Sequence, residues 1–290
     1  MDDLDLFIQS GKITSQAREY GKTLVKKGAV MFDVAQAIEQ KIRELGAVPA
    51  FPVGLSFNEI AAHWTPAPNE ERIFADDLIK LDLGACFEGA VTDTAVTIDL
   101  SGKHEKIVKA SEDALNAAIA TLRPGVMLCE IGDAIEHAMY KYGMQPVRNL
   151  SGHGIGINIV HKAPTIPNYN NGNKTTLKKG DLIAIEPFAT SGEGIVGDYG
   201  PAEFFMLLAP KQLRDPGMRV VVERIKQFQG RPFTRRWLDF PQAKVLFTLR
   251  ELEKLGVLHK YPPLVEKTKA PVAQTEHAFY IDDEVIVLTK

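Results

Sequence analysis

Apolar residues alternate with polar or small residues from residue 78 to residue 100, on both sides of Glu88-Gly89. Such alternation around a glycine-containing turn predicts a β-hairpin. Successive side chains of a strand point to opposite faces, so a two-residue turn places Asp82 opposite Ala95. Asp93 then lies on the same face as Asp82 and diagonal to it, at roughly 7–8 Å. The hairpin directs two carboxylates toward one spot, unless both are ordinary solvent-facing residues.

Helical periodicity predicts one pair of helices before this hairpin and another pair after it. Apolar residues recur every three to four positions in each segment, as on the buried face of a helix. Asp33 and Gln36 have the spacing of a capping box, and Gly143 is a helix-ending glycine. The predicted helices cover residues 14–27, 33–46, 104–122 and 129–142.

The second and fourth predicted helices belong to an internal repeat. A shift of 97 residues places Gly28 on Gly125, and a shift of 98 places His63 on His161. Two amphipathic helices can resemble each other by chance, but here glycines, prolines and histidines outside the helices also match. The period exceeds the 20–50 residues of a solenoid. The repeat therefore predicts two pseudo-symmetric halves, each contributing one histidine to a central cleft.

A segment of different character lies between residues 211 and 261. It contains twelve Lys and Arg against five Asp and Glu, a local balance of +7, and two predicted helices at 217–229 and 241–255. A short strand into Tyr261 follows. Arg231, Arg235 and Arg236 between the helices could belong to a DNA-reading winged helix. We favour a helical insertion packed on the catalytic body. The predicted domains are therefore a catalytic one, residues 1–205 and 262–290, and an inserted winged-helix-like one, residues 206–261.

Composition limits the class of protein and its compartment. The chain has 290 residues, 45% of them hydrophobic, and a net charge of −3, which describes a globular protein with a large core. Cys86 and Cys129 form no CxxC unit, which fits a reducing cytosol. The amino terminus is acidic and lacks the apolar run of a signal peptide, and no stretch is long enough to span a membrane. We expect a cytoplasmic α+β protein with no membrane partner.

Further acidic and imidazole groups lie downstream of the hairpin. Glycines flank His153, which lets the backbone approach whatever the imidazole binds. Glu186 ends an apolar run that reads as a buried strand over residues 179–188, and Glu276 lies in a last hairpin at 272–288. Four carboxylates and one imidazole suit two divalent first-row metal ions better than a structural zinc. Such a pair lowers the pKa of a bound water toward about 7, which predicts hydrolysis of an acyl or phosphoryl bond.

These five groups, in this order, resemble the ligands of the pita-bread metalloenzymes, and their flanks resemble type II methionine aminopeptidase. The resemblance covers essentially the whole chain. The spacing of 90 positions from Glu186 to Glu276 resembles type II and not the shorter type I. The absence of a charged extension before the first helix resembles the archaeal form. The matching segments are Phe51-Pro52, Asn58, Ala62-His63-Trp64-Thr65-Pro66, residues 150–156, Ile185-Glu186-Pro187-Phe188, residues 261–264 and Gln274-Thr275-Glu276-His277.

The resemblance implies a fold, a reaction and a role for each residue. The fold is α+β, with two pseudo-symmetric halves around a dinuclear metal site and a helical insertion. Asp82 would chelate one ion, Asp93 and Glu276 would bridge both, and His153 and Glu186 would complete the second. Glu186 would also move the proton of the attacking water. His63 and His161 would hold the peptide, while Phe51, Val160 and Tyr261 would line a pocket for the methionine side chain. Fe²⁺, Mn²⁺ and Co²⁺ suit this ligand set, and it can also hold Zn²⁺.

The implied function is removal of the initiator methionine from nascent polypeptides when the next residue is small. A hydroxide bridging the two ions would attack the scissile carbonyl. The expected partners are nascent N-termini, and contact with the ribosome is compatible with that substrate; no specific nucleic acid is expected, and the family suggests a monomer. Three alternatives remain at this point: a prolidase-like peptidase of the same fold, a non-enzymatic relative that binds nucleic acid through the basic insertion, and a winged-helix regulator.

Overall fold

The computed structural model describes residues 3–209, 213 and 215–290. Its helices are α1 (Asp3–Leu24), α2 (Met31–Glu44), α3 (Glu105–Thr121), α4 (Leu128–Tyr140), α5 (Pro216–Lys226), α6 (Gln242–Lys254) and the short 3-10 helix η1 (Arg235–Trp237). Its strands are β1 (Val48–Pro49), β2 (Gly54–Phe57), β3 (Ile60–Ala62), β4 (Leu78–Phe87), β5 (Ala90–Asp99), β6 (Gln145–Pro146), β7 (Ser151–Gly156), β8 (Ile159–Pro167), β9 (Leu182–Ile185), β10 (Phe188–Thr190), β11 (Val196–Asp198), β12 (Phe204–Leu207), β13 (Leu258–Tyr261), β14 (Leu264–Glu266), β15 (Val272–Gln274), β16 (His277–Tyr280) and β17 (Ile286–Val287).

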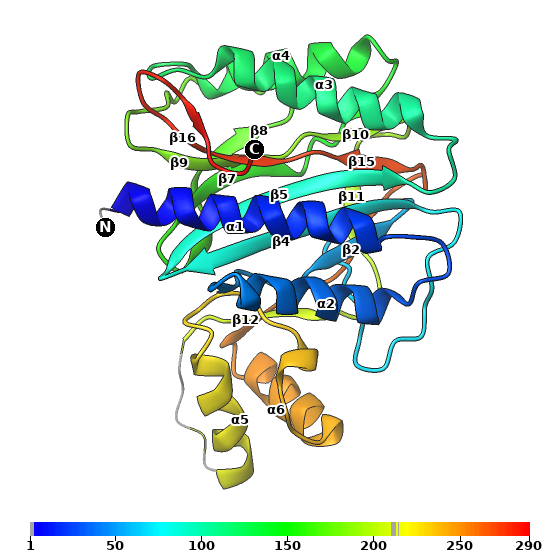
Figure 1. The fold of residues 1–290 in the computed structure, drawn as a ribbon, viewed down its shortest axis with the longest axis vertical. Helices are drawn as coiled ribbons and strands as arrows, with labels where there is room; N and C mark the ends of the chain where they lie inside the picture. The colour runs from blue at the N-terminus through cyan, green and yellow to red at the C-terminus, as the bar shows by residue number, and fades with distance from the viewer. Residues whose placement is uncertain (1–2, 210–212, 214) are drawn as a thin grey trace.

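Two similar halves face each other, each a sheet backed by helices (Figure 1). In the first, β4 pairs with β1, β2 and β5, and α1 and α2 pack against this sheet around a core that includes Ile38 and Leu81. In the second, β9 pairs with β7 and β16, β10 pairs with β6 and β15, and α3 and α4 cover the sheets. The predicted α+β fold with two halves is confirmed.

The repeat of 97 residues is confirmed in the backbone. α2 begins at Met31 and α4 at Leu128, and β1 and β6 are separated by the same shift. Gly28 and Gly125 both adopt positive φ, at 84° and 86°, where a side chain would be strained. The matched glycines outside the helices therefore mark equivalent turns, and chance similarity of two helices does not account for them.

Two helix starts differ from the prediction by more than one residue. The first helix begins by Asp3, eleven residues before Thr14, and Gly11 within it touches the backbone of Leu288 so closely that a Cβ would lie 2.1 Å from its carbonyl oxygen. This tertiary packing overrides the low helix propensity of glycine. The predicted Asp33 cap is wrong, because the second helix starts at Met31 after Val30. The amide of Met31 donates instead to the carbonyl of Arg72 (2.9 Å).

The segment between β12 and β13 folds into a small helical unit attached below the first half (Figure 1). Its own core includes Val221, Phe233 and Leu249 from α5, the connecting loop and α6. We call residues 206–261 the insertion, the range predicted above. Some residues in the predicted domain ranges, namely 1, 2, 210–212 and 214, lie outside the described part of the chain.

Candidate metal centre

The register of the β4–β5 hairpin places both aspartates as predicted. Asp82 lies opposite Ala95, and Asp93 lies opposite Gly84. Both residues line one cavity, in which Asp93 is 4% exposed and Asp82 is half-buried. The two carboxylates of this strand pair therefore extend from the first half toward the second half.

The second half brings Glu186 and Glu276 to the same place. Glu186 lies in the break between β9 and β10, where the register pairs Ile185 with His277 and Phe188 with Gln274. Glu276 exchanges backbone hydrogen bonds with Ala95 (N–O distances of 3.0 and 3.4 Å). This bridge joins the two halves beside the predicted ligands, so residues almost two hundred positions apart become neighbours.

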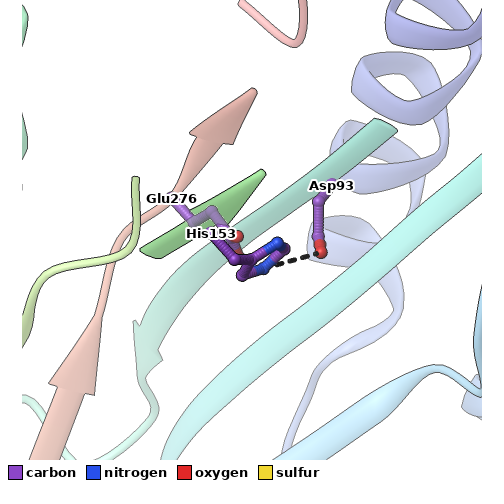
Figure 2. Close-up of side chains that lie close together, drawn as sticks. All are labelled: Asp93, His153 and Glu276. Carbon is purple, nitrogen blue, oxygen red and sulfur yellow. Dashed lines mark ion pairs between the residues drawn. The ribbon is translucent and has the colours of Figure 1, made fainter. Parts of the chain in front are cut away.

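His153 on β7 completes the group. Its Nε2 lies 3.8 Å from Asp93 Oδ2 and 3.9 Å from Glu186 Oε1. Ligand atoms of Asp93, His153 and Glu276 all lie within 4.8 Å of one another, and Figure 2 shows these three side chains converging. The carbonyl of Gly154 accepts from Nδ1 (3.2 Å), which leaves Nε2 as the free lone pair facing the carboxylates.

Gln274 is a buried contact residue that the sequence analysis did not include in the site. Its Nε2 lies 3.3 Å from Asp82 Oδ2, 3.2 Å from Glu186 Oε2 and 3.5 Å from Glu276 Oε2. One amide group therefore contacts three of the four carboxylates. The available sequence signal was its position two residues before Glu276, on the same face of the strand.

The electrostatics of the group require cations. Burial raises the pKa of Asp82 to about 7. Burial first, and repulsion from the neighbouring carboxylates second, raise the pKa values of Asp93, Glu186 and Glu276 well above their ordinary range. In the described part of the chain, no hydrogen-bond partner reaches the buried oxygens Asp82 Oδ1, Asp93 Oδ1 and Glu276 Oε1. Buried unpartnered carboxylate oxygens are costly, and divalent cations would satisfy them.

The imidazole is in the state that a metal ligand needs. Burial lowers the pKa of His153 to about 3, with repulsion from His161 as the next cause. At neutral pH the ring is therefore uncharged, and its Nε2 lone pair is available. The donor set of four carboxylates and one neutral imidazole fits divalent first-row ions.

A pocket opens from this group and contains the predicted substrate residues. Phe51, His63, Val160, His161 and Tyr261 line it together with the candidate ligands. The ring centroids of His63 and Tyr261 lie 5.4 Å apart, and those of His153 and His161 lie 4.4 Å apart. Burial lowers the pKa values of His63 and His161 to about 4, so both rim histidines are neutral at pH 7. The structure thus brings all predicted site residues around one cavity.

Two residues of the pocket wall come from parts of the chain that the motifs did not cover. Phe204 on β12 pairs with Tyr261 on β13, and Pro232 follows the end of α5. Both lie in the stretch between the two glutamates, where no motif indicates which apolar residues face the pocket. The insertion therefore contributes directly to the wall of the pocket through Pro232 and Tyr261.

The arginines between the insertion helices pack against the body of the molecule. Arg236 pairs with Glu39 of α2 (2.8 Å), and their side chains are 1% and 2% exposed. Arg235 donates its Nε to Glu203 (2.9 Å), and Arg231 is buried. The three side chains contact residues of the body, namely Glu39, Glu203, and Cys86 with Asn158. These contacts agree with the interpretation favoured above, a helical insertion packed on the body.

Comparisons with known proteins agree with this geometry. The model of metallopeptidase family M24 matches residues 5–219. A methionine aminopeptidase of Archaeoglobus fulgidus is 40% identical over 293 residues, which cover 100% of this chain and 99% of the relative.

Two solved structures share the fold. One, of a thermophilic Arx1, has a TM-score of 0.86 at 16% identity and covers 99% of this chain and 91% of that one. The other, a methionine aminopeptidase from Thermotoga maritima, has a TM-score of 0.73 at 22% identity and covers 99% and 96%. Along the described residues, every helix is too short or too polar to cross a membrane. The chain belongs to metallopeptidase family M24 and, within it, to the archaeal-type methionine aminopeptidases.

Proposed function

We propose that this chain removes N-terminal methionine from nascent peptides and proteins with two divalent ions held by Asp82, Asp93, His153, Glu186 and Glu276. Membership of a metallopeptidase family implies divalent ions, and four buried carboxylates around unpartnered oxygens support a pair of them. The ions, when bound, supply an activated water and a Lewis acid for the scissile carbonyl. Fe²⁺, Mn²⁺ and Co²⁺ are the candidates, with Zn²⁺ as a further one.

The remaining chemistry belongs to side chains of the chain. Glu186 is the carboxylate that we assign to accept a proton and return it to the leaving amine, the role that the resemblance implies. It lines the pocket, and burial and the carboxylates beside it raise its pKa. His63 and His161 are neutral, so they can donate hydrogen bonds to the peptide without carrying charge. Their task would be to hold the scissile bond.

The pocket wall supports methionine as the residue removed. Phe51, Val160 and Phe204 form one apolar cluster, and Tyr261 packs against it. An unbranched, polarizable side chain adapts well to such an irregular apolar wall. The single observation that carries the proposal is the convergence of this apolar pocket and the buried carboxylate group in one cavity.

The test uses metal-loaded protein and three short peptides beginning Met-Ala, Leu-Ala and Ala-Pro, with release of the first residue followed by mass spectrometry. We expect cleavage of the Met-Ala peptide only. Release of Ala from the Ala-Pro peptide instead would favour the prolidase-like alternative. Glu186→Gln should retain the circular dichroism of the parent and lose nearly all turnover; full activity would contradict its role. Metal analysis of both proteins then shows whether the variant has lost its metal ions or only its proton acceptor.

A further inference from the structure

Arg231 is a buried cation without a carboxylate partner. The residue is 7% exposed, and within the described chain no ion pair joins it to Asp or Glu. Its contacts are neutral atoms: Cys86 Sγ at 3.0 Å, Gln229 Oε1 at 3.4 Å and Asn158 Oδ1. Its Nε is buried and has no hydrogen-bond partner among the described residues. Because a buried guanidinium is costly unless an anion offsets it, this position calls for one.

The neighbouring carboxylates cannot supply that anion. Glu39 already accepts from both terminal guanidinium nitrogens of Arg236, from Trp237 Nε1 (2.7 Å) and from the amide of Val53. Glu203 is taken by Arg235. A carboxylate therefore neutralises Arg235 and another neutralises Arg236, whereas Arg231 remains without one.

Arg231 lies on the wall shared by two surface cavities, of about 640 and 580 Å³. Arg43 from the end of α2, Val48 of β1 and Gln227 after α5 also line both cavities. We call these two adjoining cavities together the junction cleft, because residues of both the insertion and the first half line them. Figure 1 shows α2 of the first half above α5 and α6 of the insertion. Its lining includes none of the five candidate metal ligands.

The junction cleft carries a positive balance. Arg43 is exposed and makes no ion pair with a described carboxylate, and Arg224 is bonded to the neutral amide of Gln227. With Arg231 these are three guanidinium groups that no carboxylate neutralises, whereas Glu88 is the one acid on the described wall outside the Arg236 pair. Guanidinium groups match phosphate oxygens with paired, charge-assisted hydrogen bonds. Phe228 and Trp237 add aromatic surface to the larger cavity.

We propose that the junction cleft binds a phosphate group, with Arg231 and Arg43 as its principal donors. The volume accommodates more than an inorganic ion, and the aromatic wall offers a stacking surface to a base. A nucleotide is therefore the source to which the chemistry points. The ligand lies behind the substrate pocket, because Pro232, next to Arg231, and Cys86, which contacts it, both belong to the surroundings of that pocket.

The test measures binding of AMP and of inorganic phosphate to the metal-loaded full-length chain by titration calorimetry, with the same ionic strength throughout. We expect AMP to bind with one site per chain. Arg43→Ala should weaken this binding by at least about tenfold, the loss of one charge-assisted contact. Arg231→Gln should do the same. Arg219→Ala is the matched control, since it removes an exposed arginine of α5 that does not line the cleft, and it should leave affinity unchanged.

The outcomes separate the alternatives. Inorganic phosphate that binds as tightly as AMP, with the same losses in the variants, supports the phosphate site and assigns it to the free ion. Phosphate bound at the metal ions would still bind the Arg43→Ala variant, because Arg43 is outside that pocket. An affinity that is unchanged in this variant would therefore overturn the proposal. Since Arg43 is exposed, its variant is expected to fold even if Arg231→Gln does not. Absence of binding by both probes would equally end the proposal.

Discussion

Glu39 of α2 and Arg236 of the insertion form an ion pair almost fully removed from solvent, with 2.8 Å between Glu39 Oε1 and an Arg236 guanidinium nitrogen. Arg236 also donates to the carbonyl of Pro66 and the hydroxyl of Thr65. We expect Arg236→Met to lower the free energy of unfolding by about 3–5 kcal/mol, because it leaves a buried carboxylate uncompensated. Denaturant unfolding measures this change.

Two further variants serve as controls for that measurement. Lys254→Ala removes an exposed pair with Glu251 and should cost less than about 1 kcal/mol. The double variant Glu39→Gln with Arg236→Met should recover part of the loss, since the unpaired charge is gone. A destabilisation in Arg236→Met no larger than in Lys254→Ala would show that the pair does not hold the insertion to the body.

Gln274 should matter for metal affinity although it is not one of the proposed ligands. Its Nε2 contacts Asp82, Glu186 and Glu276 at 3.2–3.5 Å and so orients their outer oxygens. Gln274→Leu keeps the size of the side chain and removes these donors. We expect Mn²⁺ affinity to fall about 10–100-fold, as for other residues that orient ligands. Calorimetric titration measures it, with exposed Gln40→Leu as control, and an unchanged affinity would contradict the orienting role.

Metal binding should release protons. Burial raises the pKa of Asp82 to about 7, and burial with mutual repulsion raises those of Asp93, Glu186 and Glu276 well above their ordinary range. Between about pH 4 and pH 7 the metal-free folded chain therefore holds protons that the unfolded chain has lost. In this window these groups make the free energy of unfolding of the metal-free protein fall as pH rises.

Ions must displace those protons to reach the oxygens. At pH 6 we expect Mn²⁺ binding to release at least about one proton per chain, and none of them from His153, whose pKa of about 3 leaves it neutral. Titrations in buffers of different ionisation enthalpy give the number. Binding without proton release at pH 6 would mean that the carboxylates are already ionised in the metal-free protein.

The site was predictable to the extent that its geometry is local or is carried by chemically distinctive residues. A two-residue turn determines the register of its hairpin, so the relation of Asp82 to Asp93 followed from parity alone. His153, Glu186 and Glu276 stood out because charged or imidazole groups interrupt apolar or glycine-rich surroundings. Their meeting in space came from the resemblance and not from any pattern in the chain.

The parts that could not be predicted depend on contacts between distant segments. The first turns of α1 are stabilised by Gly11 against Leu288 and by Ser10 and Thr14, whose hydroxyls lie 2.9 and 2.7 Å from that of Thr92. None of these contacts leaves a periodic signal. The sequence does not distinguish Arg231 from Arg236, yet Arg236 pairs with Glu39 and Arg231 contacts only neutral groups. The fold alone determines which carboxylate lies next to each arginine.

The backbone bridge between Ala95 and Glu276 has a consequence for fragments of this chain. Asp82 and Asp93 precede it in one half, whereas the imidazole and both glutamates come from the other. A proteolytic cut that separated the halves would divide the ligands two to three, and each fragment would expose acids that repel one another. We therefore expect such a cut to abolish activity completely, with neither fragment active by itself.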